Sequence, residues 1–194
     1  MKKIAVTGTI AAGKSTVSIL LRRRRKPVFD CDQYSRILYQ RTNPCFDVIV
    51  DAFGEEILDD FGEIDRKKLA QIVFSDEEKR KQLNEIVHPR IIEGMKAFFM
   101  HHSDEPLVFA EVPLLEESGL TSYFDEIVLV TCSDDTAVKR MMEDRGYTEK
   151  EALARLASQK KYSKAQRKSA TAVLVNDGTI RELDSAVGKL LREL

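Results

Sequence analysis

The chain has 194 residues, a length that suits one globular domain with small inserts. Hydrophobic residues make up 43% of it and charged residues 32%, which is too apolar a composition for intrinsic disorder. The formal net charge is only -1 at pH 7, and this excludes a general electrostatic attraction to nucleic acid or to membrane surfaces. We therefore expect neither a nucleic-acid partner nor a membrane partner.

The cysteine pattern and the lack of long apolar runs indicate the compartment. Cys31, Cys45 and Cys132 form no CxxC pair and no metal-ligand spacing, which favours reduced thiols over a disulfide framework. No apolar stretch before Gly8 is long enough for a signal peptide, and no later run is long enough to span a bilayer. We expect a cytoplasmic protein that is a monomer or a small homo-oligomer.

Five short apolar runs predict the strands of one sheet. Helical patterns separate the runs, and strands that alternate with helices favour a mostly parallel sheet with helices on both faces. We therefore expect a three-layer α/β fold over residues 1–194 with a five-stranded parallel sheet. The predicted strands cover residues 3–7, 27–30, 107–112, 126–131 and 172–175.

Residues 31–103, between the second and third predicted strands, are too many for a simple crossover and show helical patterns. Asp65 precedes one such pattern, and Ser75 with Glu78 has the spacing of a capping box before the next. Pro89 is expected to end that helix and to start another. We interpret this segment as an inserted helical subdomain.

Residues 133–168, between the fourth and fifth predicted strands, form a second and more basic insert. Two helical patterns meet at Gly146, a helix stop, and Thr148 with Glu151 forms another capping box. A basic helical pair on the phosphate side of the sheet predicts a mobile lid, whereas the usual role of such charges is a solvated helix face.

The segment Gly8 to Ser15 matches the pattern G-x-x-x-x-G-K-[ST] and lies between a predicted strand and a predicted helix. Such a loop wraps backbone N–H groups around a polyphosphate, and the helix N-terminus adds partial positive charge. The lysine would reach the β- and γ-phosphates, and the serine hydroxyl would ligate Mg²⁺. The residues predicted to bind ATP here are Gly8, Ala11, Ala12, Gly13, Lys14, Ser15 and Thr16.

Acidic residues follow two of the predicted strands, where the carboxyl ends of parallel strands face the ligand crevice. Asp32, in the segment Asp30-Cys31-Asp32, is placed to accept the proton of an attacking hydroxyl or to position that hydroxyl. An equally good interpretation is that Asp32 caps a helix that begins at Gln33. Glu111 could hold Mg²⁺ through water, or it could simply be a polar residue at a strand end.

The basic run from Arg22 to Lys26 resembles a nucleic-acid patch, but such runs are more often the exposed, dipole-favoured end of a helix. We prefer the helix end. His101 and His102 have no metal partner at useful spacing and are interpreted as a helix end rather than a zinc site.

In their order and spacing these pieces resemble the dephospho-CoA kinase family over nearly the whole chain. Its phosphate loop and its D-A-D segment resemble Gly8–Ser15 and Asp30-Cys31-Asp32. The further matching segments are Phe53-Gly54, Ile64-Asp65-Arg66, Val73-Phe74, His88-Pro89, Pro113 to Glu117, the lid residues Arg140, Arg145, Arg155 and Gln159, and Asn176 with Gly178.

The resemblance implies that ATP, with Mg²⁺, phosphorylates the ribose 3′-hydroxyl of dephospho-CoA to give CoA and ADP. It assigns catalysis to Lys14, Asp32, Arg140 and Arg145. It also implies that the first insert binds the acceptor and that the second is the lid. Asp30, Asp32 and His88 would contact the acceptor, and Asn176 would lie near the adenine of ATP.

Three positions depart from the family pattern. Thr9 and Ala11 replace glycines of the phosphate loop, and a Cβ is strained there if either position needs a positive φ. Cys31 replaces the alanine between the two aspartates. Thr171 stands where the family has an aspartate before the last strand.

Other functions share parts of these signals. A nucleoside or nucleotide monophosphate kinase has the same phosphate loop, acceptor insert and basic lid. A P-loop switch that binds a nucleotide without transferring phosphate is a second alternative, although Asn176-Asp177-Gly178 does not fit the N-K-x-D segment that specifies guanine. A third alternative is a structural or nucleic-acid-binding protein with a vestigial phosphate loop, and only the arginine run supports it.

Overall fold

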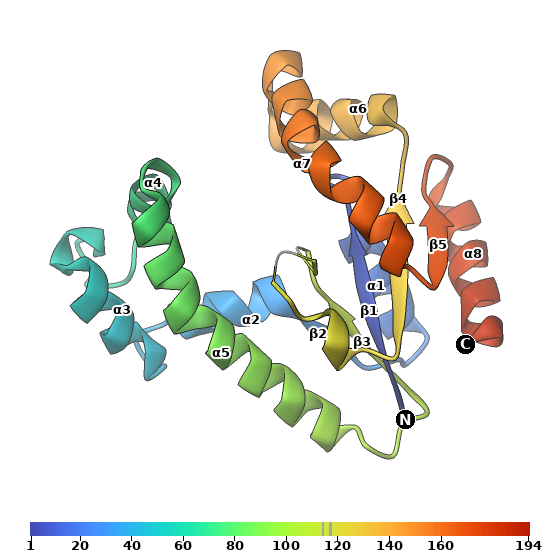
Figure 1. Cartoon of the computed structure of the whole chain (residues 1–194), viewed down its shortest axis with the longest axis horizontal. Helices are drawn as coiled ribbons and strands as arrows, with labels where there is room; N and C mark the ends of the chain where they lie inside the picture. The colour runs from blue at the N-terminus through green and yellow to red at the C-terminus, as the bar shows by residue number, and fades with distance from the viewer. Residues whose placement is uncertain (114, 117) are drawn as a thin grey trace. The chain divides into compact units, whose positions relative to one another are not determined.

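The computed structural model describes residues 1–113, 115–116 and 118–194, without the side chains of residues 160–164 (Figure 1). The chain divides into two compact units. The first comprises Met1–Phe29 and His102–Leu194, and the second comprises Asp30–His101. Among the described residues, no helix combines the length and the apolar character needed to cross a bilayer.

The sheet has five strands in the order β2-β3-β1-β4-β5. β1 pairs in parallel with both β3 and β4, and β4 pairs in parallel with β5, so the expected parallel α/β sheet is confirmed. The predicted bounds of the last two strands agree with the structure, and β3 ends one residue earlier than predicted. The strands are β1 (Lys2–Gly8), β2 (Val28–Asp30), β3 (Leu107–Glu111), β4 (Glu126–Thr131) and β5 (Ala172–Val175).

The two faces of the sheet carry different helices. Val6, Val128 and Leu174 belong to one buried cluster with the apolar faces of α1 (Lys14–Arg23) and α8 (Ile180–Glu193). Residues next along each strand point to the opposite face, because side chains alternate along a strand. α7 packs against β4 and lies in front of it in Figure 1.

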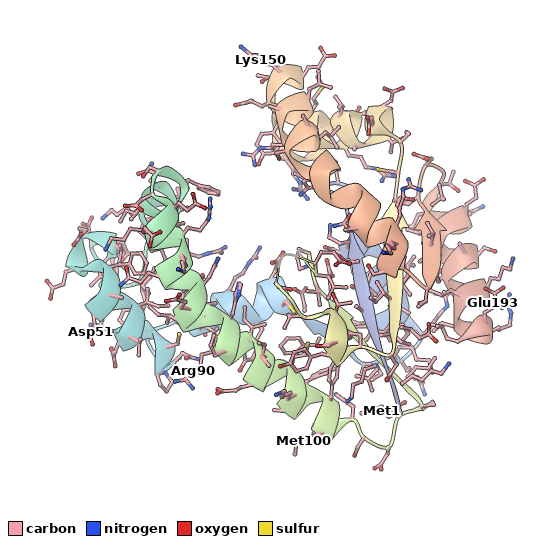
Figure 2. All side chains as sticks on the ribbon, in the orientation of Figure 1. Met1, Asp51, Arg90, Met100, Lys150 and Glu193 are labelled. Carbon is pink, nitrogen blue, oxygen red and sulfur yellow. The ribbon has the colours of Figure 1, made fainter. Side chains whose placement is uncertain are left out.

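The predicted lid consists of α6 (Asp134–Arg145) and α7 (Glu149–Ser169). Gly146 ends α6 with φ 68°, and Thr148 forms the predicted capping box with Glu151. Lys150, in the first turn of α7, lies at the end of this helix pair farthest from the sheet (Figure 2). Apolar residues of the two helices pack with each other and with Ile10 of the phosphate loop.

The second unit is helical throughout its named elements and has its own apolar core. A short 3-10 helix, Glu55–Ile57, joins two of its helices, and a second, Thr121–Tyr123, lies in the first unit. The α-helices of the second unit are α2 (Cys31–Leu38), α3 (Cys45–Phe53), α4 (Arg66–Ser75) and α5 (Glu77–His101).

Two predictions about this unit are wrong. Pro89 does not divide the helix, because α5 runs through it with Leu83 and Val87 buried before it and Met95 buried after it. Continuous burial of one helix face outweighs the hydrogen bond that proline removes. Ser75 is not the cap of α5 either. Asp76, the next residue, accepts from the backbone N–H groups of Glu78 and Lys79 at 2.9 and 3.1 Å.

Two other helix ends agree with their predictions. Asp65 caps α4 by accepting from the backbone N–H of Lys67 at 2.8 Å. α5 ends at His101, which confirms the helix-end interpretation of the histidine pair. The sequence therefore predicts the N-cap of a helix where a single polar residue precedes the helical pattern.

Gly94 marks a close approach between α2 and α5. A Cβ built on Gly94 would collide with the ring of Tyr34, whereas one built on Gly188 of α8 would meet nothing nearer than 3.7 Å. We expect Gly94→Ala to lower the free energy of unfolding by about 1–3 kcal/mol, the usual cost of overpacking. Gly188→Ala should be neutral or stabilising by up to about 1 kcal/mol, because alanine favours the helix. Urea denaturation of both variants measures the difference, and equal stability would contradict the close approach.

Candidate active site

The phosphate loop connects β1 to α1, and two glycines at its ends are required by close contacts. Gly8 has φ 151° and Gly13 has φ 96°, both in the region that favours glycine. A Cβ on Gly8 would collide with the carbonyl oxygen of Val130, and one on Gly13 would collide with the side-chain amide of Asn176. The loop is therefore held between β4 and the segment that follows β5.

Ala11, one of the two residues that replace glycines of the family's phosphate loop, has the strained backbone expected for such a position. Its φ is 58°, and the other described non-glycine residue with a positive φ is Arg25. Thr9 does not have a positive φ. Only one of the two replaced glycines therefore occupies a left-handed position.

The loop carbonyls receive hydrogen bonds from the side chains of Lys14, Arg140 and Asn176, and Cys132 Sγ lies 3.9 Å from the Ala11 carbonyl oxygen, to which it donates. Lys14 Nζ donates to the carbonyl oxygens of Gly8 and Thr9, both at 2.9 Å. Arg140 donates to the Ala11 carbonyl at 3.2 Å, and the buried Asn176 donates from Nδ2 to the Ala12 carbonyl at 2.8 Å.

Arg140 also binds the backbone of Asn176 and so joins the base of α6 to the segment after β5. Its Nη2 donates to the Asn176 carbonyl oxygen at 2.9 Å. Of the residues expected to act on ATP, Lys14, Arg140 and Asn176 thus converge on one loop. Arg145 lies in the last turn of α6, and among the described residues it makes no hydrogen bond to this loop.

The sequence reasoning did not assign a role to Gln159, whose contact with the loop is direct. Its Oε1 accepts from the backbone N–H of Ile10 at 2.8 Å. This contact spans residues far apart in the chain and has no local sequence signal beyond the position of Gln159 on a helix.

Ser15 and Glu111 meet at the start of α1. Ser15 Oγ donates to Glu111 Oε1 at 2.7 Å, and Glu111 is only 4% exposed. Its second oxygen, Oε2, is buried without a hydrogen-bond partner in the part of the chain that the structure describes. An unpartnered buried carboxylate oxygen is unfavourable unless a cation or proton satisfies it. The pair therefore fits a hard divalent cation, which prefers oxygen ligands.

The described residues contain no cluster of three or more His, Cys, Asp or Glu side chains that could hold a metal ion. A cation beside Ser15 and Glu111 would need further oxygens from phosphate or water, which is how Mg²⁺ is commonly bound at such loops.

The predicted acceptor residues lie in the second unit. Asp30 caps α2, accepting from the Gln33 backbone N–H at 2.9 Å, so the alternative that Asp32 is the cap is wrong. Asp32 lies in the first turn of that helix. His88 lies on α5, where burial lowers its pKa below the usual value.

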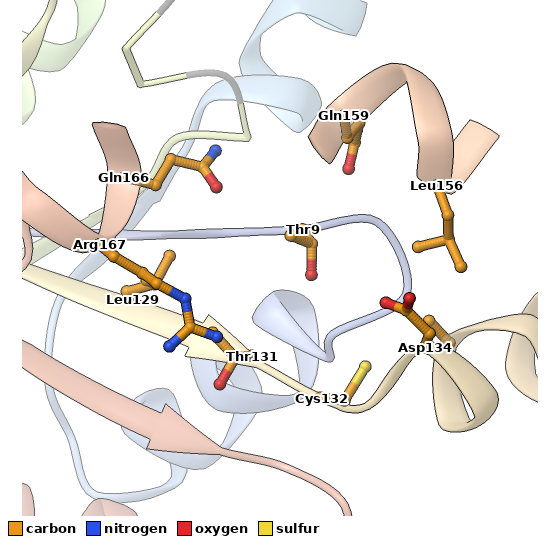
Figure 3. Close-up of a pocket in the computed structure, with 10 residues that line it drawn as sticks. Thr9, Leu129, Thr131, Cys132, Asp134, Leu156, Gln159, Gln166 and Arg167 are labelled. Atoms are coloured by element: carbon orange, nitrogen blue, oxygen red, sulfur yellow. The ribbon is translucent and has the colours of Figure 1, made fainter. Parts of the chain in front are cut away.

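A cavity of about 260 Å³ opens beside the loop in the first unit, between the end of β4 and the helices α6 and α7 (Figure 3). Its apolar lining comes from Leu129, Ala137 and Leu156, and its polar lining comes from Thr9, Thr131, Asp134, Gln159, Gln166 and Arg167.

The chain is similar over nearly its whole length to proteins of known family. The family model described as dephospho-CoA kinase matches residues 2–182. A dephospho-CoA kinase from Geobacillus kaustophilus is 42% identical over 192 residues, which cover 98% of this chain and 95% of that protein. A solved structure from Thermus thermophilus has a TM-score of 0.84 at 35% identity and covers 100% of this chain and 97% of its own. The dephospho-CoA kinase from Campylobacter jejuni has a TM-score of 0.73 at 25% identity, with coverages of 98% and 96%.

A parallel α/β sheet with a glycine-bounded phosphate loop between β1 and α1 defines the class of P-loop nucleotide-binding proteins, which includes the P-loop kinases. The family match and the relatives make the assignment specific. The chain belongs to the dephospho-CoA kinase family.

Relief of the strain at Ala11 gives a test of the loop geometry. A left-handed conformation costs an L-residue roughly 1–2 kcal/mol, whereas a new glycine costs about 0.4–1 kcal/mol in chain entropy. We expect Ala11→Gly to raise the free energy of unfolding by up to about 1 kcal/mol. Ala12→Gly, at a buried neighbour without a positive φ, should lower it. Chemical denaturation measures both, and a loss of stability in both variants would show that Ala11 is unstrained.

Proposed function

We propose that this chain uses ATP to phosphorylate the ribose 3′-hydroxyl of dephospho-CoA, giving CoA and ADP in the final step of coenzyme A biosynthesis. The observation that carries the proposal is family membership over residues 2–182 together with a phosphate loop whose carbonyls accept hydrogen bonds from Lys14 and Arg140. Such a loop presents backbone N–H groups to an anion, as polyphosphate binding requires.

The loop, Ser15, Thr16 and Asn176 form the proposed ATP site. Lys14 Nζ now bonds two loop carbonyls, and the same cation would bind the β- and γ-phosphates when ATP enters. Arg140 and Arg145 would neutralise charge that develops on the transferred phosphoryl group as the lid of residues 133–168 closes.

Mg²⁺ is the proposed metal, held by Ser15 Oγ and by Glu111, directly or through water. When bound it supplies positive charge to the phosphate oxygens. The buried, unpartnered Oε2 of Glu111 supports this assignment, because a carboxylate in that setting is stabilised by a neighbouring cation.

The acceptor would bind to the helical insert of residues 31–103. Asp30 is the helix cap, so Asp32 is the better candidate for accepting or orienting the hydroxyl proton. Partial burial lowers the pKa of His88, which favours the neutral imidazole, and we propose that it contacts the acceptor by hydrogen bonding.

The partners expected for this enzyme are ATP and dephospho-CoA, in the cytoplasm, without nucleic acid and as a monomer or small homo-oligomer. Part of the arginine run is used within the fold. Arg24 pairs with Asp184 at 2.5 Å, and Arg22 donates to the Val28 carbonyl at 3.2 Å. These contacts support the helix-end interpretation over a nucleic-acid patch.

A coupled ADP-release assay tests the substrate. With ATP and Mg²⁺ we expect strong turnover with dephospho-CoA and little with AMP, CMP, UMP or free nucleosides, and mass spectrometry should find one phosphate added to dephospho-CoA. Selective turnover of a nucleotide would replace the proposed acceptor. ATP binding without acceptor-dependent turnover of any of these compounds would indicate a nucleotide switch instead.

Substitutions of Asp32 and Lys14 separate the acceptor role from the ATP role. We expect Asp32→Asn to abolish transfer while ATP binding remains within about twofold, because the amide cannot take a proton. Lys14→Ala should abolish transfer and weaken ATP binding as well, because it removes charge from the phosphates. Calorimetric titration with ATP, beside the turnover assay, distinguishes the two. Turnover like the wild type in Asp32→Asn would exclude Asp32 from the mechanism.

Glu111→Gln tests the metal assignment. The amide keeps the size of the side chain and can still accept from Ser15, but it loses the negative charge that attracts a cation. We expect the Mg²⁺ concentration for half-maximal turnover to rise at least tenfold while the Tm stays near that of the wild type. The Mg²⁺ dependence of initial rates measures this, and an unchanged requirement would remove Glu111 from the metal site.

A further inference from the structure

The peptide group between Thr9 and Ile10 is held by hydrogen bonds at both of its ends. Its carbonyl oxygen accepts from Lys14 Nζ at 2.9 Å and from the backbone N–H of Ala12 at 3.3 Å. Its N–H donates to Oε1 of Gln159, a residue of α7, at 2.8 Å. A peptide group bonded at both ends cannot turn without losing a hydrogen bond, so these contacts fix its direction.

The apolar face of α7 brings Gln159 to this peptide group. Ala152 and Leu156 are buried in a cluster against which Ile10 of the loop packs. Gln159 follows Leu156 by three residues, and residues three apart lie on the same face of a helix. In Figure 3 the side chain of Gln159 points from α7 toward the loop at Thr9. The packing of α7 and its polar contact with the loop therefore occur together.

Glutamine is a side-chain type that suits this position. A backbone N–H can only donate, so the atom of Gln159 that meets it is the amide oxygen. A leucine would leave the Ile10 N–H, which is part-buried, without this acceptor. A glutamate would accept the same hydrogen bond, but it would also place a negative charge beside a loop that binds anions. The amide supplies the acceptor without the charge.

The contact gains importance when ATP binds as proposed above. Lys14 would then turn toward the β- and γ-phosphates. The Thr9 carbonyl would lose its charged donor and keep the longer hydrogen bond from Ala12. Gln159 would continue to hold the other end of the peptide group, because its partner is the N–H of Ile10 and not a group that Lys14 uses.

We propose that Gln159 is a positioning residue for nucleotide binding. It holds the Thr9–Ile10 peptide group in place while Lys14 binds phosphate, so that the loop keeps the shape in which its N–H groups face the anion. The inference rests on the proposed function for the identity of the ligand, ATP. Gln159 acts through Ile10 and not by touching the nucleotide, and the packing of α7 on the loop thereby contributes to nucleotide affinity.

Exchange of the Ile10 amide proton, measured by NMR on the whole chain, tests the contact itself. In the wild type we expect slow exchange both without nucleotide and with ATP and Mg²⁺, because Gln159 stays bonded to Ile10. Gln159→Leu should speed this exchange about tenfold in both states, the usual effect of losing one hydrogen bond. Gln159→Glu should exchange like the wild type without nucleotide. Slow exchange in Gln159→Leu without nucleotide would contradict the contact, and slow exchange only after ATP binds would show that a phosphate takes this N–H. Either result would overturn the proposal.

Calorimetric titration with ATP and Mg²⁺, without an acceptor, tests the effect on nucleotide binding. Gln159→Leu should weaken binding about tenfold, by a factor that does not depend on salt. Gln159→Glu should bind more weakly than the wild type at low salt and approach it as salt screens the added charge. Ser158→Ala changes the preceding residue, whose hydroxyl donates to the Arg155 carbonyl, and should bind ATP like the wild type.

Steady-state kinetics separate a positioning role from a general loss of structure. Gln159→Leu should raise the KM for ATP and leave the KM for the acceptor within twofold. ATP affinity like that of the wild type in Gln159→Leu, a deficit of Gln159→Glu that salt does not reduce, or an equal rise of both KM values would overturn the positioning role. The exchange and titration measurements contain no acceptor, so a failure to phosphorylate dephospho-CoA would contradict the proposed function and leave this inference standing.

Discussion

The structure depends on which groups donate hydrogen bonds to the backbone carbonyls of the phosphate loop. A loop that points its N–H groups at a ligand must turn its carbonyl oxygens elsewhere, and buried carbonyls need donors. Here Lys14 donates from the start of α1, whereas Arg140 of α6 and Asn176 of the segment after β5 donate from distant parts of the chain. The carbonyl of Gly13 is satisfied within α1 by the N–H of Val17 at 3.0 Å.

This arrangement links α6 to the phosphate loop. Arg140 holds the loop at Ala11 and the post-β5 segment at Asn176 together, so movement of α6 would disturb both. Lys14 and Arg140 are cations that donate to neutral carbonyls of the loop. Phosphate oxygens are stronger acceptors for cations than carbonyl oxygens are, because the hydrogen bond is charge-assisted on both sides. These side chains therefore place two positive charges beside the loop.

Much of this could be read from the sequence because the signals are local. The bounds of β4 and β5, the two loop glycines and the caps at Asp65 and Thr148 follow from patterns of a few residues. The errors occurred where packing outweighs local chemistry. α5 passes through Pro89 because its buried residues lie on one face on both sides of the proline.

Other features had no local signal. Asp30 and Asp32 are both suitable helix caps by type, and only the backbone geometry selects Asp30. The contact of Gln159 with Ile10 and the pair of Ser15 with Glu111 join residues far apart in sequence. A single sequence contains the partners of such contacts without indicating which of them meet.

Thr171, a departure from the family pattern, shows how a changed residue can be accommodated. Its Oγ1 accepts from the N–H of Ile127 at 2.9 Å and lies 3.1 Å from the Ile127 carbonyl oxygen, to which it can donate. A carboxylate at this position could accept from the N–H but could not donate to the carbonyl. The hydroxyl therefore joins the start of β5 to β4 by bonds to one backbone residue, and the register that carries Asn176 to the phosphate loop is maintained without the acidic side chain.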